Sequence, residues 1–235
     1  MSPAPDDESP PAGPDFGSGV LSQVAAFVYW HLIVGVLMCA TSVPVVVLFL
    51  FLGRDPSNLP LVPLYLIPYG PVLSAGLYAL RDRTRAEELA PARSFLRGIR
   101  IGWRDALKAW TPAMAFQALV LGGLTASGTA VSGWYVVVLA TIAVIVLVWG
   151  LNALVIATFF SFRWRDIARL AVYYIGRCWM VAIGELALLV VAVGVVWLAT
   201  EGALWLIAVV FAAFLLTISR PLVADVETRF THREA

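Results

Sequence analysis

The stretch WYVVVLATIAVIVLVWGLNALVIATFFSF, residues 134–162, decides the fold because it carries no charge along its whole length. An α-helix needs about 20 predominantly apolar residues to cross the hydrocarbon core of a bilayer. Similar uncharged runs lie before and after it, separated by short polar connections. With 61% hydrophobic and 13% charged residues, the 235-residue chain has a composition unlike that of a soluble domain. We therefore expect an all-α, polytopic integral membrane protein.

The cations of the chain lie almost entirely on one side of the expected membrane. Of the sixteen Lys and Arg residues, only Arg54 falls in a connection opposite to the others. Cytoplasmic loops carry an excess of Lys and Arg, so this bias also sets the orientation. The preference for Arg over Lys is typical of a GC-rich bacterial genome. The sequence thus predicts a multi-pass protein of the bacterial cytoplasmic (inner) membrane, with both termini in the cytoplasm.

The chain divides into three regions. Residues 1–20 are acidic and rich in Pro, with no apolar face, and we expect a disordered tail. Residues 21–221 form a membrane domain of six transmembrane helices, and residues 222–235 a short cytoplasmic tail. The expected spans cover residues 20–53, 59–80, 109–124, 134–162 and 175–199, with a sixth span ending at residue 220.

Prolines interrupt the first two apolar runs. Pro44 offers a kink that could absorb the excess length of the first span, because proline removes one backbone hydrogen bond. Pro68 and Pro71 bracket Gly70 in the second run, so a regular helix is expected only from about Pro71 onward. The outer half of this run is expected to be irregular. Such a segment is tolerated at membrane depth only if it packs against protein or faces a cavity.

A basic amphipathic helix is expected on the cytoplasmic face, over about residues 92–108. Its apolar stripe consists of Phe95, Leu96, Ile99, Trp103, Leu107 and Trp110, and its basic face of Arg93, Arg97, Arg100, Arg104 and Lys108. A basic face opposite a Trp/Phe/Leu face is typical of a helix in the membrane interface, where the cations would contact lipid headgroups. The alternative is a helix that packs on the cytoplasmic surface of the protein itself.

Glu185 is the only carboxylate deep inside an expected span, and such residues are candidates for function. Counting along each helix places Asn152, Gln117, His31 and Ser74 at similar depth. One interpretation is an intramembrane polar cluster that binds a cation, a proton or a polar group of a substrate. The other is a structural network in which Asn152 and Gln117 accept from or donate to a protonated Glu185.

Sequence motifs for phosphate binding, zinc-dependent catalysis and metal binding are absent. It contains no Gly-rich phosphate loop followed by Lys-Ser/Thr, no His-Glu-x-x-His and no cysteine pairs at metal-ligand spacing. His31 and His232 are expected at different depths, and Cys39 and Cys178 lie in different apolar runs. We expect no catalytic residue set, no metal, no cofactor and no nucleic-acid partner.

Two segments resemble a known family. The stretches SVPVV (residues 42–46) and PYGPVLSAGLY (residues 68–78) resemble the YesL-like family of bacterial integral membrane proteins, a domain of unknown function. That family closes its first helix with a Ser-Leu-Pro-Val-Val segment and opens its second with a Gly-Pro segment. The likeness covers about residues 25–115, and the later half of the chain matches mainly in hydropathy. An insertion, residues 48–67, separates two motifs that the family keeps almost adjacent.

The resemblance implies a function in transport. Members of the family are often associated with sugar-importing ABC systems, so the chain is expected to be an accessory protein of carbohydrate uptake. Its expected partners are the lipid bilayer, ABC transporter subunits or a second copy of itself. Two alternatives remain open: a membrane-embedded enzyme that uses Glu185 as acid or base, and a structural or regulatory scaffold that senses lipid.

Overall fold

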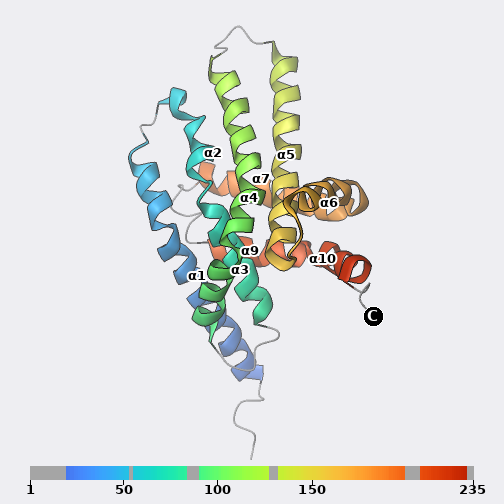
Figure 1. Ribbon diagram of the computed structural model, residues 1–235. Coiled ribbons are helices and arrows are strands. Elements are labelled where there is room, and N and C mark those ends of the chain that lie inside the picture. The colour runs from blue at the N-terminus through green and yellow to red at the C-terminus, as the bar shows by residue number, and fades with distance from the viewer. Residues whose placement is uncertain (1–19, 53–54, 84–89, 127–131, 199–206, 232–235) are drawn as a thin grey trace, which may run out of the picture.

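The computed structural model describes residues 20–52, 55–83, 90–126, 132–198 and 207–231, and these ranges contain helices but no strand (Figure 1). The all-α class predicted from the sequence is confirmed. The helices are α1 (Val20–Leu50), η1 (Pro56–Asn58), α2 (Leu61–Tyr65), α3 (Tyr69–Asp82), α4 (Pro91–Ala126), α5 (Gly133–Phe159), α6 (Trp164–Arg177), α7 (Trp179–Leu198), α9 (Ala208–Ile218), α10 (Arg220–Val226) and a last turn, η3 (Glu227–Thr231).

Parts of the predicted terminal tails lie outside the described residues. Of the acidic tail predicted for residues 1–20, only Val20 is described, as the first residue of α1. The predicted C-terminal tail, residues 222–235, is described as far as residue 231, where it forms most of α10 and the turn after it.

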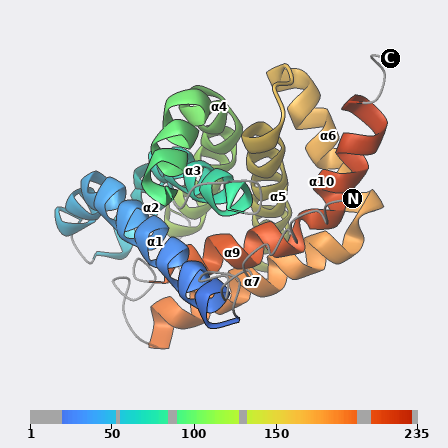
Figure 2. The same cartoon turned by 90° about the horizontal axis from the view of Figure 1, so that it is seen from below.

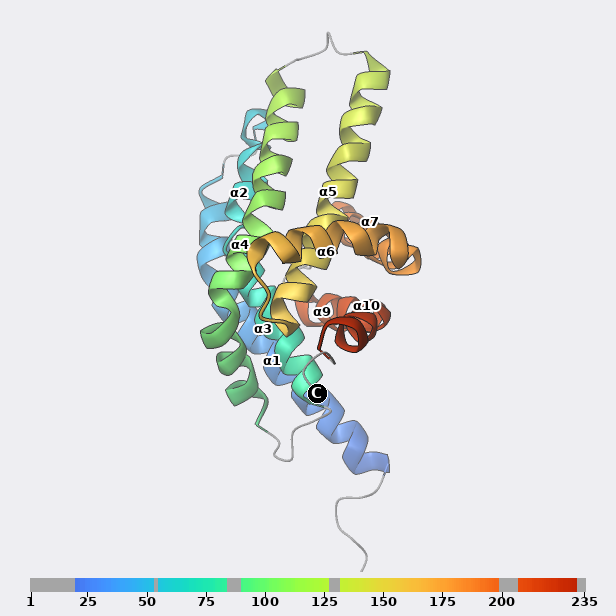
Figure 3. The ribbon, with the colours of Figure 1, turned by 45° about the vertical axis from the view of Figure 1, so that its right-hand side comes forward.

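The helices form two groups that cross each other. α1, α3, α4 and α5 run roughly side by side, whereas α6, α7, α9 and α10 run across them (Figures 1 and 3). Viewed along the first group, α7 and α9 lie next to each other, and α9 contacts α1 (Figure 2). α3 is the central element, because it contacts α1, α4, α5 and α9.

Small residues let the neighbouring helices approach α3 closely. Residues 72–77 of α3 are all buried. A Cβ atom added at Gly76 would lie 2.7 Å from Sδ of Met38 in α1, and one added at Gly98 in α4 would lie 3.2 Å from Cα of Ala75. Interfaces between membrane helices commonly use small residues in this way, because packing rather than the hydrophobic effect drives their association.

The second apolar run is broken, as its prolines predict. α2 ends at Tyr65 and α3 begins at Tyr69, two residues before Pro71. Trp110 of α4 covers the break: its indole Nε1 donates to the carbonyl oxygen of Leu66 at 3.0 Å. The ring also fills the space beside Gly70, where a Cβ would lie 2.8 Å from Trp110 Cβ. The irregular segment therefore packs against protein, as an irregular segment must if it lies at membrane depth.

The basic amphipathic segment is not a separate helix. Residues 92–108 form the first half of α4, a helix of 36 residues that continues through Pro112. Phe95 is fully buried and the neighbouring Gly98 packs on α3, so one side of the segment belongs to the protein core. Leu96 and Trp103 of the predicted apolar stripe remain 59% and 43% exposed. An interfacial position for this helix is not confirmed.

An amphipathic helix lies instead in a region predicted to be only a connection between two spans. α6 buries Ile167, Ala171 and Tyr174 on one side, at the spacing of a helical face, and exposes its arginines. α6 and the described part of α7 meet at a bend of 96°. The spacing of Ile167, Ala171 and Tyr174 in the sequence is the signal for this helix.

Two helices of the described part are individually long and apolar enough to span a membrane, Leu21–Leu50 and Gly133–Phe159. The number rises to four if α6 with α7, and α9 with α10, each form one bent span. The pair α9 and α10 is bent by 49°. The structure thus has the helices of a membrane protein, and the predicted six spans are not confirmed.

Candidate functional site

Glu185 lies in the protein core. It shares the buried face of α7 with Val181 and Leu188, and its own exposed fraction is 0%. Gly184 lets the end of α9 approach this part of α7, because a Cβ there would lie 2.7 Å from Cγ2 of Ile218. Neither carboxyl oxygen of Glu185 has a hydrogen-bond partner in the described part of the chain.

Three further buried side chains lack hydrogen-bond partners among the described residues. They are the amide of Asn152 in α5, the hydroxyl of Ser42 in α1, and the hydroxyl of Ser219 between α9 and α10. Buried polar groups are nearly always paired, so each such group calls for an explanation, such as a water molecule or an ion. Unpartnered polar groups therefore occur on both crossing groups of helices.

The other members of the predicted polar cluster have partners elsewhere. Gln117 Nε2 donates to the carbonyl oxygen of Ala143 at 2.6 Å, and so joins α4 to α5. Ser74 Oγ accepts from the Thr158 hydroxyl at 2.9 Å. His31 Nδ1 lies 2.8 Å from the carbonyl oxygen of Phe27 on its own helix. In the described residues, the expected hydrogen bond from Glu185 to Asn152 or Gln117 is not formed.

An apolar cavity of about 190 Å³ lies where the two groups of helices cross. Its lining includes Tyr69, Trp110, Leu151, Leu189 and Phe211. Leu151 adjoins Asn152 in sequence, and Leu189 lies about one turn after Glu185. The lining itself is almost entirely apolar, so this cavity suits an apolar group and offers no set of polar contacts.

A second, larger cavity opens between α1, α3, α9 and α10, and we call it the basic cleft. Its volume is about 530 Å³. It is lined by Phe27, His31, Leu80, Arg81, Arg83, Phe159, Ala213, Leu216, Thr217, Arg220, Val223, Ala224 and Glu227. Arg81 forms an ion pair with Glu227. The lining comes from the start of α1, the ends of α3, α5 and α9, and α10.

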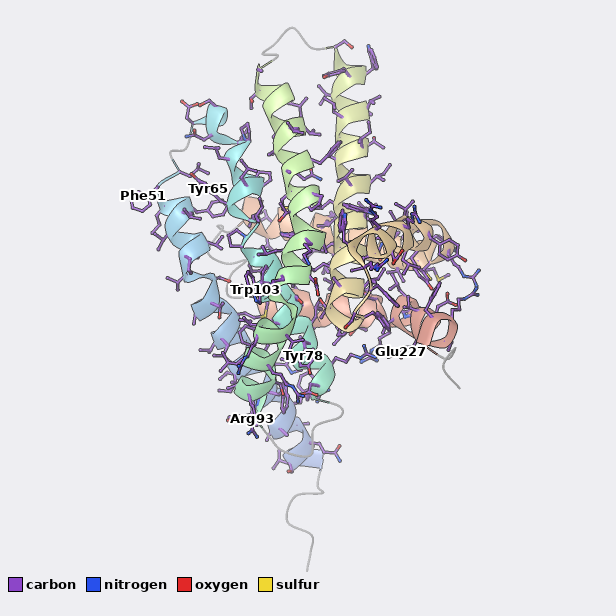
Figure 4. The ribbon with its side chains drawn as sticks, viewed as in Figure 1. Phe51, Tyr65, Tyr78, Arg93, Trp103 and Glu227 are labelled. Carbon is purple, nitrogen blue, oxygen red and sulfur yellow. The ribbon has the colours of Figure 1, made fainter. Side chains whose placement is uncertain are left out.

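The basic cleft lies toward the end of the molecule that the sequence predicts to be cytoplasmic. Arg93 lies at the opposite end from Phe51 and Tyr65, whereas Tyr78, near the end of α3, lies in the same half of the molecule as Arg93 (Figure 4). In the sequence, the cleft arginines indicate only the orientation of the chain. They end apolar segments that are distant in sequence, and only the fold shows that these ends meet.

A second group of charges ties α6 to α10. The Tyr174 hydroxyl donates to Asp225 at 2.9 Å, Arg229 Nε donates at 3.0 Å, and Arg177 Nε lies 3.5 Å away. Partial burial alone would raise the pKa of Asp225, but the hydrogen bonds from Tyr174 and Arg229 and the charges of the two arginines outweigh it. The carboxyl pKa therefore lies below its ordinary value of 3.8. Asp225 is thus a structural anion that joins two helices.

The residues predicted to contact lipid headgroups are exposed along α4. Arg93, Arg97, Arg100 and Arg104 all lie on the outer side of the helix. The Cζ atom of Arg104 lies 5.2 Å from the centre of the Trp103 ring, and Lys108 Nζ lies 3.1 Å from Asp105. Their exposure is compatible with the predicted contact to lipid phosphate.

Comparison of the chain with family models, curated proteins and solved structures finds no match. In the described part, no group of three or more His, Cys, Asp or Glu side chains is placed to hold a metal ion. The class of protein therefore rests on the fold: an all-α protein with apolar helices long enough to cross a membrane.

Proposed function

We propose that the chain is a polytopic protein of the bacterial inner membrane that assists an ABC-type carbohydrate uptake system. The resemblance of residues 42–46 and 68–78 to the YesL-like family supports this function. Both segments lie in the central contact of the fold: Ser42 is buried in α1, and Gly70 and Gly76 allow close packing of α3. Close helix packing therefore explains why this motif has glycine at these two positions.

The exposed apolar surface is the observation that best supports a membrane protein with a partner. The first half of α5 exposes apolar side chains around most of its circumference, among them Trp134, Val137 and Ile145. A helix that is apolar on every side belongs in a protein core or in a membrane. We expect lipid on most of this surface, with a transporter subunit or a second copy of the chain on the remainder.

Sugar uptake by intact cells tests this function. We expect that deletion of the gene slows the uptake of at least one sugar imported by an ABC system, and that the wild-type chain restores it. Cross-linking in native membranes should then join the chain to the membrane subunit of that importer. Unchanged uptake of every sugar tried, together with no cross-link to an importer subunit, would exclude the accessory function.

The unpartnered carboxyl of Glu185 favours a second candidate function, in which the chain binds a cation or proton during transport. In that case Glu185→Gln should abolish the pH dependence of sugar uptake while the protein remains in the membrane. An enzyme that uses Glu185 as acid or base would lose its activity with the same substitution. A structural or lipid-sensing scaffold should tolerate it, so this variant separates the three alternatives.

A further inference from the structure

The basic cleft carries more positive than negative charge. The guanidinium groups of Arg81, Arg83 and Arg220 line it, against the single carboxylate of Glu227. Glu227 is paired with Arg81. Among the described residues, no carboxylate forms an ion pair with Arg83 or Arg220. Within the described ranges, two cations of the cleft therefore have no carboxylate paired with them.

Aromatic rings hold two of these guanidinium groups in place. The Cζ atom of Arg83 lies 4.8 Å from the centre of the Phe27 ring, and that of Arg81 lies 4.5 Å from the centre of the Phe159 ring. A guanidinium that rests on a ring is held by the attraction between its charge and the ring face. Its N–H groups point outward in the guanidinium plane, where they can still donate to an oxyanion.

The remainder of the cleft is apolar. Leu80, Leu216 and Val223 contribute to its walls. A volume of about 530 Å³ falls within the usual range for small-molecule sites and is much larger than a single inorganic ion requires. The cleft therefore suits a molecule that has an anionic group beside an apolar portion.

We propose that the basic cleft binds the phosphate group of an amphiphilic molecule, with Arg83 and Arg220 as its donors. Arginine matches phosphate because its planar fork of N–H groups can form two parallel hydrogen bonds to the oxygens. Two cations without anionic partners also balance the charge of a phosphate monoester, which is about −1.5 to −2 at neutral pH. The phosphate could come from a phospholipid of the inner leaflet or from a soluble phosphorylated metabolite. This proposal does not depend on the function in sugar uptake.

The soluble source is tested with full-length protein in an uncharged detergent. Phenyl phosphate, which combines a phosphate with an apolar ring, is titrated by calorimetry, and inorganic phosphate is titrated in parallel. If the cleft binds soluble phosphate esters, phenyl phosphate should bind at least about tenfold more tightly than inorganic phosphate, because only the ester fills the apolar walls.

The lipid source is tested in nanodiscs. Discs of phosphatidylcholine alone are compared with discs that also contain phosphatidic acid, and lipid retained on the protein is counted by native mass spectrometry. Retention of phosphatidic acid without binding of phenyl phosphate would assign the site to lipid, and the reverse result would assign it to a soluble ligand. Binding of both supports recognition of the phosphate itself. Binding of neither would overturn the proposal.

Variants locate the binding in the cleft. The double variant Arg83→Gln/Arg220→Gln should weaken the binding of whichever ligand is found by about tenfold or more, since it removes both donors. Arg165→Gln/Arg169→Gln makes the same change of charge on the exposed side of α6 and should leave binding unchanged. An equal loss in the two double variants would show general attraction to a basic surface and would contradict a site in the cleft.

A variant that is expected to bind phosphate more tightly controls for loss of binding through misfolding. Glu227→Gln removes the negative charge of a carboxylate that lines the cleft and would repel a phosphate. It should therefore strengthen binding by several-fold, on the order expected for one charged partner. Weaker or unchanged binding in this variant would contradict the proposed role of the cleft arginines.

Discussion

At the scale of single residues, Glu185 is the side chain whose environment is most unusual. It is fully buried, and its two oxygens have no hydrogen-bond partner in the described residues. A buried polar group without a partner costs about 1 to 3 kcal/mol. Glu185→Leu removes this cost in a side chain of similar size, so we expect the unfolding free energy in detergent to rise by about 1 kcal/mol or more. Glu185→Gln, which stays polar, should remain near wild type.

Denaturant unfolding followed by circular dichroism measures both variants. A loss of stability in Glu185→Leu would mean that the carboxyl holds a partner in the folded protein, such as a water molecule or a cation. That result would favour the function in which Glu185 binds a cation or proton. The measurement thus shows whether the Glu185 carboxyl is buried without a partner or binds a water molecule or a cation in the folded protein.

The burial of Glu185 could be predicted from the sequence, but its surroundings could not. Its place in a long uncharged run is enough to predict depth. Depth alone does not show which faces of two helices meet, and the predicted cluster depended on those faces. Gln117 points to a carbonyl of α5 and His31 to one of its own helix, so equal depth did not bring them to Glu185.

At the scale of helices, the contact between α4 and α5 depends on small residues. A Cβ added at Gly150 would lie 2.6 Å from Cβ of Ala113, which cannot rotate away. We expect Gly150→Ala to lower the unfolding free energy by about 1 to 3 kcal/mol through overpacking. Gly102→Ala is the matched control, because its Cβ would lie 3.6 Å from Ser74 Oγ, an ordinary contact. Equal unfolding free energies of the two variants would show that α4 and α5 can move apart without loss of stability.

The tie between α6 and α10 should respond to acid. Because the pKa of Asp225 is lower in the folded protein than its ordinary value of 3.8, its contribution is present at neutral pH and is lost as the pH falls through the folded-state value. Spin labels at Val172 and Thr228 should give a narrow distance distribution at neutral pH and a broad one in acid. Asp225→Asn should broaden it at both. A narrow distribution in this variant at neutral pH would contradict the tie, and Asp105→Asn on α4 is the control.

The helices themselves were predicted better than their limits. The break before Tyr69 follows from the spacing of Pro68 and Pro71, which is a local property of the backbone. The predicted boundary near residue 108 was different in kind, because it relied on where the charges end. A helix can continue through such a change when neighbouring helices support it, and α3 supports α4 there. Hydropathy therefore located the apolar segments but could not show where one helix ends.

At the scale of the whole molecule, the crossing of the two groups of helices is the feature that hydropathy could not predict. A run of apolar residues shows that a segment can lie in a membrane, and it carries no information on direction. α7 and α9 are as apolar as a span, yet they run across α1, α4 and α5 (Figure 1). The direction appears in the 96° bend between α6 and α7, and the hydrogen bond from Tyr174 of α6 to Asp225 of α10 is a tertiary contact that holds α6 there.

Cysteine labelling in intact cells tests how the chain is threaded through the membrane. In a background with Cys39→Ala and Cys178→Ala, an impermeant reagent should label cysteines placed at Asn58, Ser127 and Gly202. It should not label cysteines at Ala92 or Thr231, because the positive-inside bias places both in the cytoplasm. Ser127 and Gly202 lie outside the described residues.

Gly202 is the decisive position, since it connects the two apolar segments that run across the others. Labelling at Gly202 requires α7 and α9 each to cross the bilayer, as the six-span prediction states. If Gly202 is protected while Asn58 and Ser127 are labelled, α7 and α9 enter and leave from the cytoplasmic side as a re-entrant pair. Such a pair is compatible with the membrane only because it packs against the rest of the protein. Labelling of Ala92 or Thr231 from outside would instead overturn the orientation that the arginines predict.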